Sequence, residues 1–130
     1  MAEVIVGIES TAHTFSFGSV SLAGAPSPST SALYRPESGG IHPREAADHH
    51  SIRSKTLFTE FLDANEFSPE DIKAIAFSQG PGLGPCLRIG ATVARTLSAR
   101  LDIPLIGVNH CVAHIEIGRN QTGCDDPVLL

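Results

Sequence analysis

The chain has 130 residues, of which 42% are hydrophobic and 18% are charged, and this composition excludes a disordered tail. Its length predicts one domain that buries a core without help from disulfides or a structural metal. The net charge of −5, from 9 basic and 14 acidic residues, argues against a chain that holds nucleic acid by itself.

The sequence also gives expectations about location. No apolar run approaches the length of a bilayer span, so we expect no membrane-spanning segment and no membrane partner. The N-terminus carries an acid where a secretion signal needs a base, so we expect no such signal. The 3 cysteines form no Cys-x-x-Cys pair, which favours reduced thiols and a cytoplasmic location.

The first third of the chain predicts strands. Residues 4–8 are β-branched and apolar, which indicates a buried central strand, and residues 15–20 alternate as a half-buried strand does. Residues 23–32 are rich in Ala, Pro and Ser and predict an exposed loop. A third strand is expected at 33–35.

The middle of the chain predicts a long helix over residues 44–65. Its buried face is marked by apolar residues at helical spacing: Leu57, Phe58, Phe61 and Leu62. His49 and His50, early in this helix, are predicted to form a surface pair. Residues 68–71 combine a serine cap, a proline and two acids, which predicts a short helical turn before a fourth strand at 74–78.

A rigid turn at 80–85 leads into a second long helix, whose apolar residues Ile89, Val93, Leu97 and Leu101 recur four apart. A fifth strand at 104–108, a third helix from His110 and a new strand at 127–130 follow. This order predicts an α/β fold, with a mixed sheet covered by helices on both faces. The order is that of ribonuclease-H-like proteins and of one lobe of the actin-like ATPases.

His110 and His114 are four apart on the predicted third helix, so their imidazoles lie on one face and could share a metal ion. The alternative interpretation is that His110 and His114 are simply two polar residues on a helix surface. The helix follows directly after a strand, which is where open α/β sheets place their sites. Cys111 occupies the position where a zinc protease carries its glutamate, so the pair is not that motif.

Glu9, Ser10 and Thr11 form a polar turn after the first strand. Their hydroxyls and backbone amides could face phosphate while the carboxylate orients water, or they could simply bond locally in a hairpin. The glycine-rich turn at 80–85 matches neither nucleotide-binding fingerprint. It could bind an anion at the helix N-terminus, or serve as a stiff turn that lets helix and strand approach closely.

Four segments together resemble one family: residues 7–14, residues 34–36 with 39–50, residues 80–90, and residues 107–119. This is the family of tRNA threonylcarbamoyladenosine synthases, which includes the catalytic subunit of the KEOPS complex and bacterial TsaD, formerly called O-sialoglycoprotein endopeptidases. The first and last segments are more similar to its archaeal and eukaryotic branch.

The resemblance implies the N-terminal lobe of an actin-like ATPase. In it, His110 and His114 are two ligands of one divalent metal ion, iron or zinc, that helps hold threonylcarbamoyl-AMP. The resemblance assigns Glu9, Ser10 and Thr11 to the catalytic cleft, near the phosphates. The implied activity is acyl transfer to the adenosine next to the anticodon of tRNA, with ATP or adenylate bound in the full-length enzyme.

The resemblance also implies partners and departures. The partners are a small dimerisation subunit and a kinase-like ATPase subunit, with the helix around 45–62 docking one of them. Family members continue past this chain with a tyrosine ligand, a glycine-rich phosphate loop and an aspartate ligand. Residues 1–130 are therefore expected to be a single, truncated lobe without its second lobe, inactive on its own. The 23–32 loop is longer than is usual in the family.

Three other functions remain to be weighed. A non-catalytic actin-like scaffold would have no need for paired imidazoles. A ribonuclease-H-like nuclease would need several carboxylates at strand ends, yet Ser78 ends the fourth strand. A metalloprotease is disfavoured by Cys111.

Overall fold

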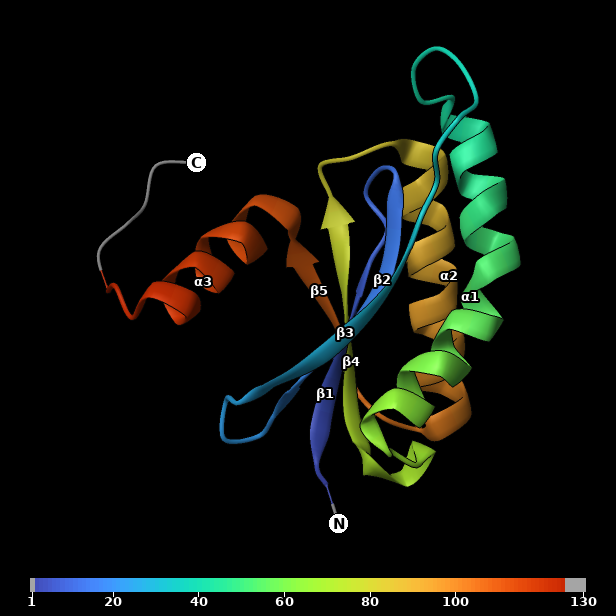
Figure 1. Cartoon of the computed structure of the whole chain (residues 1–130). Helices are drawn as coiled ribbons and strands as arrows, with labels where there is room; N and C mark the ends of the chain where they lie inside the picture. Colours follow the sequence, from blue (N-terminus) through green and yellow to red (C-terminus); the bar gives the residue numbers. More distant parts are fainter. Residues whose placement is uncertain (1, 126–130) are drawn as a thin grey trace.

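The computed structural model describes residues 2–125, and its elements follow the predicted order (Figure 1). The strands are β1 (Val4–Glu9), β2 (Thr14–Ser21), β3 (Pro26–Leu33), β4 (Ile72–Gly80) and β5 (Leu105–Asn109). The helices are α1 (Pro43–Asn65), α2 (Gly84–Leu101), α3 (His110–Thr122) and a 3-10 turn at Pro69–Asp71. The predicted strand at 127–130 lies outside the described residues.

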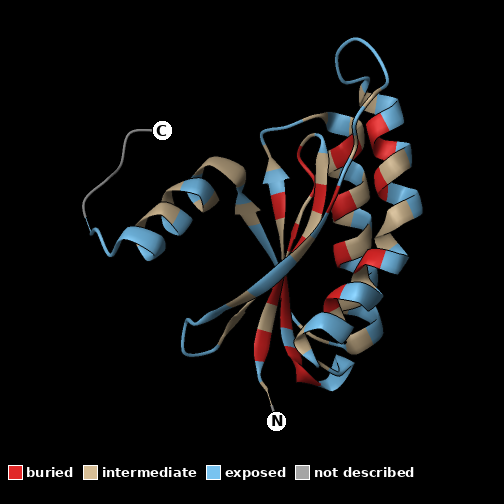
Figure 2. Cartoon of the chain, in the orientation of Figure 1, coloured by how far each residue is buried: buried red, intermediate tan, exposed pale blue. Residues whose placement is uncertain are grey.

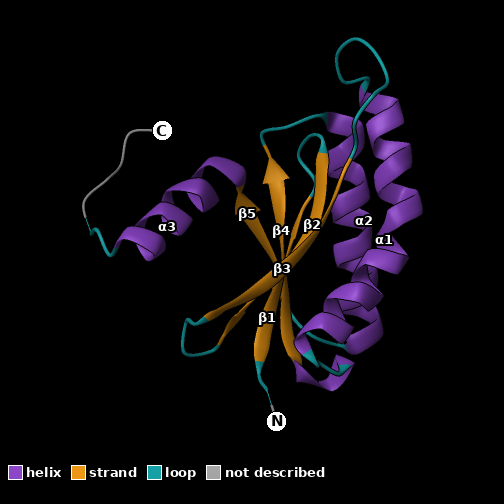
Figure 3. Ribbon diagram, in the orientation of Figure 1, coloured by secondary structure: helices purple, strands orange, loops and turns teal. Residues whose placement is uncertain are grey.

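The five strands form one mixed sheet in the order β3-β2-β1-β4-β5. β1 pairs antiparallel with β2, and β2 with β3, whereas β4 runs parallel to both β1 and β5. Helices α1 and α2 lie together along one face of the sheet, and α3 extends on the other side (Figure 3). The predicted mixed sheet with helices on both faces is therefore confirmed.

The hydrophobic core lies between the sheet and the α1–α2 layer (Figure 2). Alternate residues of β1, namely Val4, Val6 and Ile8, point into it, as the two-residue period of a strand requires. Burying an apolar side chain of this size stabilises the fold by about 1.5–3 kcal/mol. In the described part of the chain, the opposite face of the sheet carries only α3, a helix with no buried residue.

The prediction of a loop at 23–32 and a strand at 33–35 is wrong. Strand β3 occupies Pro26–Leu33, and only residues 22–25 turn. β3 is an edge strand that pairs with β2 alone, so its prolines need not donate to a second neighbour. Its short, polar side chains are typical of a loop, but the ladder with β2 holds them in strand conformation.

The prediction of a surface histidine pair at the start of α1 is wrong for one member. His50 is fully buried, with its ring 5.6 Å from that of Phe15. Its Nε2 lies 2.7 Å from the carbonyl oxygen of Ala12, in the turn between β1 and β2. The second turn of α1 thus packs beneath the polar turn that follows β1. Within residues 2–125, no helix is both long and apolar enough to span a membrane.

Candidate functional site

The site forms where three parallel strands end. Glu9 is the last residue of β1, Ser78 lies near the end of β4, and His110 follows β5 directly. Because β1, β4 and β5 are parallel neighbours, their carboxyl ends share one edge of the sheet. This edge is the usual ligand position in open α/β sheets.

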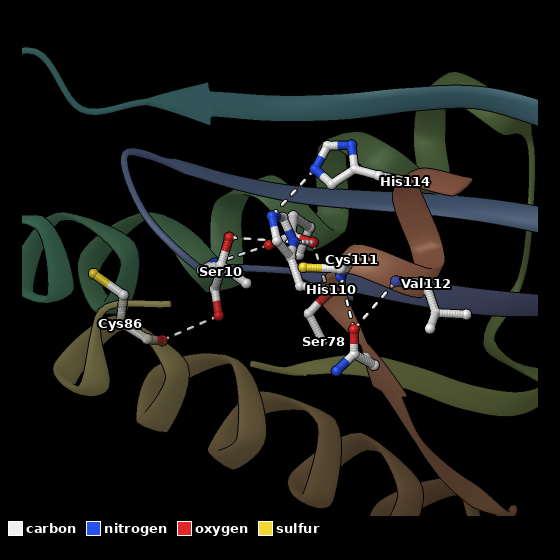
Figure 4. Close-up of polar contacts among 10 residues, drawn as sticks. Ser10, Ser78, Cys86, His110, Cys111, Val112 and His114 are labelled. Atoms are coloured by element: carbon white, nitrogen blue, oxygen red, sulfur yellow. Dashed lines mark hydrogen bonds and ion pairs between the residues drawn. The ribbon is translucent and has the colours of Figure 1, made fainter. Parts of the chain in front are cut away.

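Helix α3 begins at His110 because Asn109 caps it. The Asn109 side-chain oxygen accepts hydrogen bonds from the amides of Cys111, at 2.9 Å, and Val112, at 3.1 Å. One turn further along, His114 lies beside His110, and their Nε2 atoms are 3.1 Å apart. Figure 4 shows the two imidazoles facing each other. The helical spacing therefore brings the two predicted ligands together.

Glu9 lies at the centre of a small hydrogen-bond network. Its Oε2 accepts from the Ser78 hydroxyl at 2.6 Å and lies 3.1 Å from Nδ1 of His110. Its Oε1 accepts from the amide of Thr11 at 2.9 Å. Burial raises the pKa of Glu9, but the hydrogen bonds from Ser78, Thr11 and His110 outweigh it, so the pKa lies below the ordinary value. Glu9 is accordingly ionised near neutral pH.

Ser10 and Thr11 occupy different environments. The Ser10 side chain is buried and donates to the backbone oxygen of Cys86 in α2, at 3.0 Å, so it points away from the histidines (Figure 4). Thr11 stays near the site, with its Oγ1 3.5 Å from Nδ1 of His110. The catalytic roles given to these residues stay predictions, and for Ser10 the geometry indicates a contact with α2 instead of with a ligand.

The glycine-rich turn packs closely against the backbone of Thr11. The amide of Leu83 donates to the Thr11 carbonyl oxygen at 2.7 Å. A Cβ added at Gly82 would lie 2.6 Å from that oxygen and 2.7 Å from the Thr11 Cβ. Only glycine fits there, which favours the interpretation as a turn for close approach. An anion-binding role for the turn stays a prediction.

A pocket of about 440 Å³ opens between α3 and the sheet face opposite to α1 and α2. It is lined by the following residues: Gly7, Ile8, Glu9, Ser16, Gly18, Ser29, Ala76, Phe77, Ser78, Val108, His110, Ala113, His114 and Ile117. Among the described residues, Glu9 is the one acid in this lining, and the two histidines lie with it and Ser78 at the polar end of the pocket. Within residues 2–125, no group of three or more His, Cys, Asp or Glu side chains is arranged to hold a metal ion.

Ser78 also belongs to the site, although the sequence predicted nothing for it except the absence of the carboxylate that a nuclease would need there. Its hydroxyl instead donates to Glu9 from the neighbouring strand. The signal was available, because a polar residue at the end of a strand parallel to β1 falls at the same sheet edge.

The sequence model of the family described as "TsaD: tRNA N6-adenosine threonylcarbamoyltransferase" matches residues 28–130. The chain belongs to this family. A tRNA N6-adenosine threonylcarbamoyltransferase of Pyrobaculum calidifontis is 50% identical over 129 residues, which cover 98% of this chain and 38% of that protein. A "probable bifunctional tRNA threonylcarbamoyladenosine biosynthesis protein" of Methanosarcina acetivorans is 54% identical over 97% of this chain and 23% of its own length. The chain thus spans well under half of these curated relatives.

Solved structures agree on the fold of this threonylcarbamoyltransferase-family chain. YeaZ from Pseudomonas aeruginosa matches 95% of this chain and 50% of its own, with a TM-score of 0.68 and 17% identity. Thermus thermophilus RuvC matches 98% of this chain and 84% of its own, with a TM-score of 0.53 and 11% identity. These likenesses concern the fold alone, and they confirm the predicted ribonuclease-H-like and actin-like α/β architecture.

Proposed function

We propose that this chain is the N-terminal part of a tRNA N6-adenosine threonylcarbamoyltransferase. The enzyme moves the threonylcarbamoyl group from threonylcarbamoyl-AMP to the adenosine next to the anticodon, in the cytoplasm. The observation that carries the proposal is the pair of imidazole Nε2 atoms, 3.1 Å apart, at the polar end of the pocket. Membership of the family supplies the reaction and the substrates.

The pair is suited to one divalent metal ion, iron or zinc. A metal–imidazole bond is about 2.0–2.1 Å long, so two cis ligand nitrogens lie roughly 3.0–3.4 Å apart. The observed 3.1 Å between the Nε2 atoms of His110 and His114 falls within that range. Such an ion would supply charge neutralisation for phosphate, or polarisation of the acyl carbonyl. Its further ligands would come from outside residues 2–125.

The pocket itself suits a small acyl-adenylate group. Its volume of about 440 Å³ lies within the usual range for small-molecule sites, about 300–1,000 Å³. Its walls include small or apolar residues, among them Gly7, Gly18, Ala76 and Val108, which leave room for the ligand and do not compete for its polar atoms. ATP or the adenylate would complete its contacts in the full-length enzyme.

Partners are needed to bring tRNA to this site. A net charge of −5 gives this lobe no electrostatic attraction for RNA, so basic surface has to come from the rest of the protein or from other KEOPS subunits. Some relatives are named bifunctional biosynthesis proteins, which supports a second activity linked to this one. The small dimerisation subunit is one proposed partner, and the helix around 45–62 is proposed to dock one of the partners. The kinase-like ATPase subunit is the other proposed partner.

The test uses the protein at its natural length with His110 and His114 both replaced by alanine. We expect loss of bound metal, measured by elemental analysis, and loss of single-turnover transfer from threonylcarbamoyl-AMP to tRNA. His42→Ala is the matched control, because His42 is exposed and makes no side-chain cap hydrogen bond to α1. Unchanged metal content and unchanged transfer in the double variant would overturn the role of the two histidines. Unchanged metal content and unchanged complex assembly, with no transfer by either protein, would overturn the proposal and favour a non-catalytic scaffold.

A nuclease and a protease are weaker candidates. The single carboxylate in the pocket lining, that of Glu9, is too few for a two-metal nuclease. The residue after His110 is Cys111, so the glutamate that a zinc protease uses to activate water is absent from that position.

A further inference from the structure

We propose that Glu9 is a positioning residue for His110. Its carboxylate accepts the Nδ1 proton of that imidazole and thereby directs the Nε2 lone pair toward a divalent cation shared with His114. This inference rests on the proposed function, because it concerns the same pair of histidines. It assigns to Glu9 a role that is neither metal ligand nor general base.

The first support is that both Glu9 oxygens already hold donors from this chain. Oε1 accepts from the Thr11 amide, and Oε2 accepts from the Ser78 hydroxyl and faces Nδ1 of His110. An ionised carboxylate offers about four acceptor positions, so three of them are used within the protein. Direct binding of a metal by Glu9 would therefore have to use the one position that remains or displace one of these donors.

The second support is the tautomer that this contact imposes. An ionised carboxylate only accepts hydrogen bonds, so the Nδ1 of His110, 3.1 Å away, has to carry a proton. A neutral imidazole protonated at Nδ1 has its lone pair at Nε2, which is the atom 3.1 Å from Nε2 of His114. Carboxylate partners of this kind fix the orientation of metal-binding histidines in many sites.

The third support is that no other described residue offers Nδ1 of His110 an acceptor equal to the Glu9 carboxylate. The next nearest partner is the Thr11 hydroxyl, at 3.5 Å, which is long for a hydrogen bond and can donate as well as accept. Without Glu9, the proton of His110 is free to move to Nε2, where it would block metal binding. Glu9 is held in place by β1, which pairs with β2 on one side and β4 on the other, whereas α3 has no buried residue to fix its own position.

The experiment has two readouts on the protein at its natural length. In the metal-free protein, nitrogen-15 NMR of the imidazoles reports which nitrogen of His110 is protonated. We expect the Nδ1–H form in the unmodified protein, and a shift toward Nε2–H in Glu9→Ala. Titration with Co²⁺ alone, followed by its visible absorption, is then expected to show affinity roughly 10–100-fold weaker in Glu9→Ala.

Two further variants make the test decisive. Glu116→Ala is the matched control, because it removes a carboxylate of α3 that pairs with Arg119 outside the pocket and leaves the Glu9–His110 contact in place. It is expected to keep both the tautomer and the Co²⁺ affinity. Glu9→Gln preserves side-chain shape and serves if Glu9→Ala fails to fold. A glutamine has one accepting oxygen, whereas Glu9 uses one oxygen for Thr11 and the other for Ser78 and His110. Glu9→Gln is therefore expected to weaken Co²⁺ binding too.

Two results would overturn the role of Glu9. One is an unchanged His110 tautomer with unchanged Co²⁺ affinity in Glu9→Ala. The other is complete loss of Co²⁺ binding, equal to that of His110→Ala, which would make Glu9 a ligand. Failure of the proposed metal site is separate, because then the unmodified protein would not bind Co²⁺ while the NMR readout would still report the Glu9–His110 contact.

Discussion

Replacing Gly90 with alanine tests how closely α2 packs on the turn after β1. Gly90 is buried, and an added Cβ would lie 2.1 Å from Oγ of Ser10 and 3.1 Å from its Cβ. The Ser10 side chain would have to move and give up its hydrogen bond to Cys86. Overpacking costs about 1–3 kcal/mol and an unsatisfied buried hydroxyl about 1–3 kcal/mol more, while alanine returns about 1 kcal/mol of helix propensity. We expect a net loss of about 1–5 kcal/mol.

The assay is urea unfolding followed by far-UV circular dichroism. Gly84→Ala in the same helix is the matched control, because nothing lies within 4 Å of its added Cβ, and it is expected to be neutral or stabilising by up to about 1 kcal/mol. In the double variant Ser10→Ala/Gly90→Ala the clashing hydroxyl is gone, so the losses should fall short of additivity by about 1–2 kcal/mol. If Gly90→Ala is as harmless as Gly84→Ala, the close packing described here is refuted.

Three further outcomes are expected. Gly82→Ala should destabilise the protein and weaken Co²⁺ binding, because its methyl group meets the backbone of Thr11, which cannot rotate away; unfolding curves and the Co²⁺ titration check this. Burial holds the pKa of His49 and His50 below the ordinary value of 6.5. As the pH falls, these histidines therefore become protonated in the unfolded chain before they do in the folded protein. The free energy of unfolding should therefore be constant above about pH 6.5 and decrease as the pH falls further. His50→Gln should reduce this decrease, which urea unfolding at about pH 7.5 and about pH 5.5 measures. Burial also raises the pKa of the Cys86 thiol, so mass spectrometry should find it alkylated only when urea unfolds the protein.

The long helices were predictable because their own periodicity specifies them. In α2, Ile89, Val93, Leu97 and Leu101 recur every four residues, and all four pack against the core. Strand β3 was not predictable in the same way, since its residues have weak strand preference and only pairing with β2 fixes them. The burial of His50 likewise depends on contact with the β1–β2 turn, which local sequence does not report.

The sequence predicts which residues form the candidate site better than it predicts where their side chains point. The spacing of His110 and His114 forecast their contact, because an α-helix places residues four apart on one face. The inward position of Ser10 was also open to prediction. The two-residue alternation of β1 continues past Ile8, so Ser10 points to the core side while Glu9 points to the pocket.

Core and site therefore depend on one register. β1 pairs Ile8 with Phe77 of β4, which places the following residues, Glu9 and Ser78, side by side at the strand ends. A slip of one residue would turn Glu9 toward the α1–α2 layer and expose Ile8 in its place. The apolar alternation of β1 resists that slip, because it would leave a carboxylate in the core. The packing that stabilises the sheet is thus also what holds Glu9 against His110.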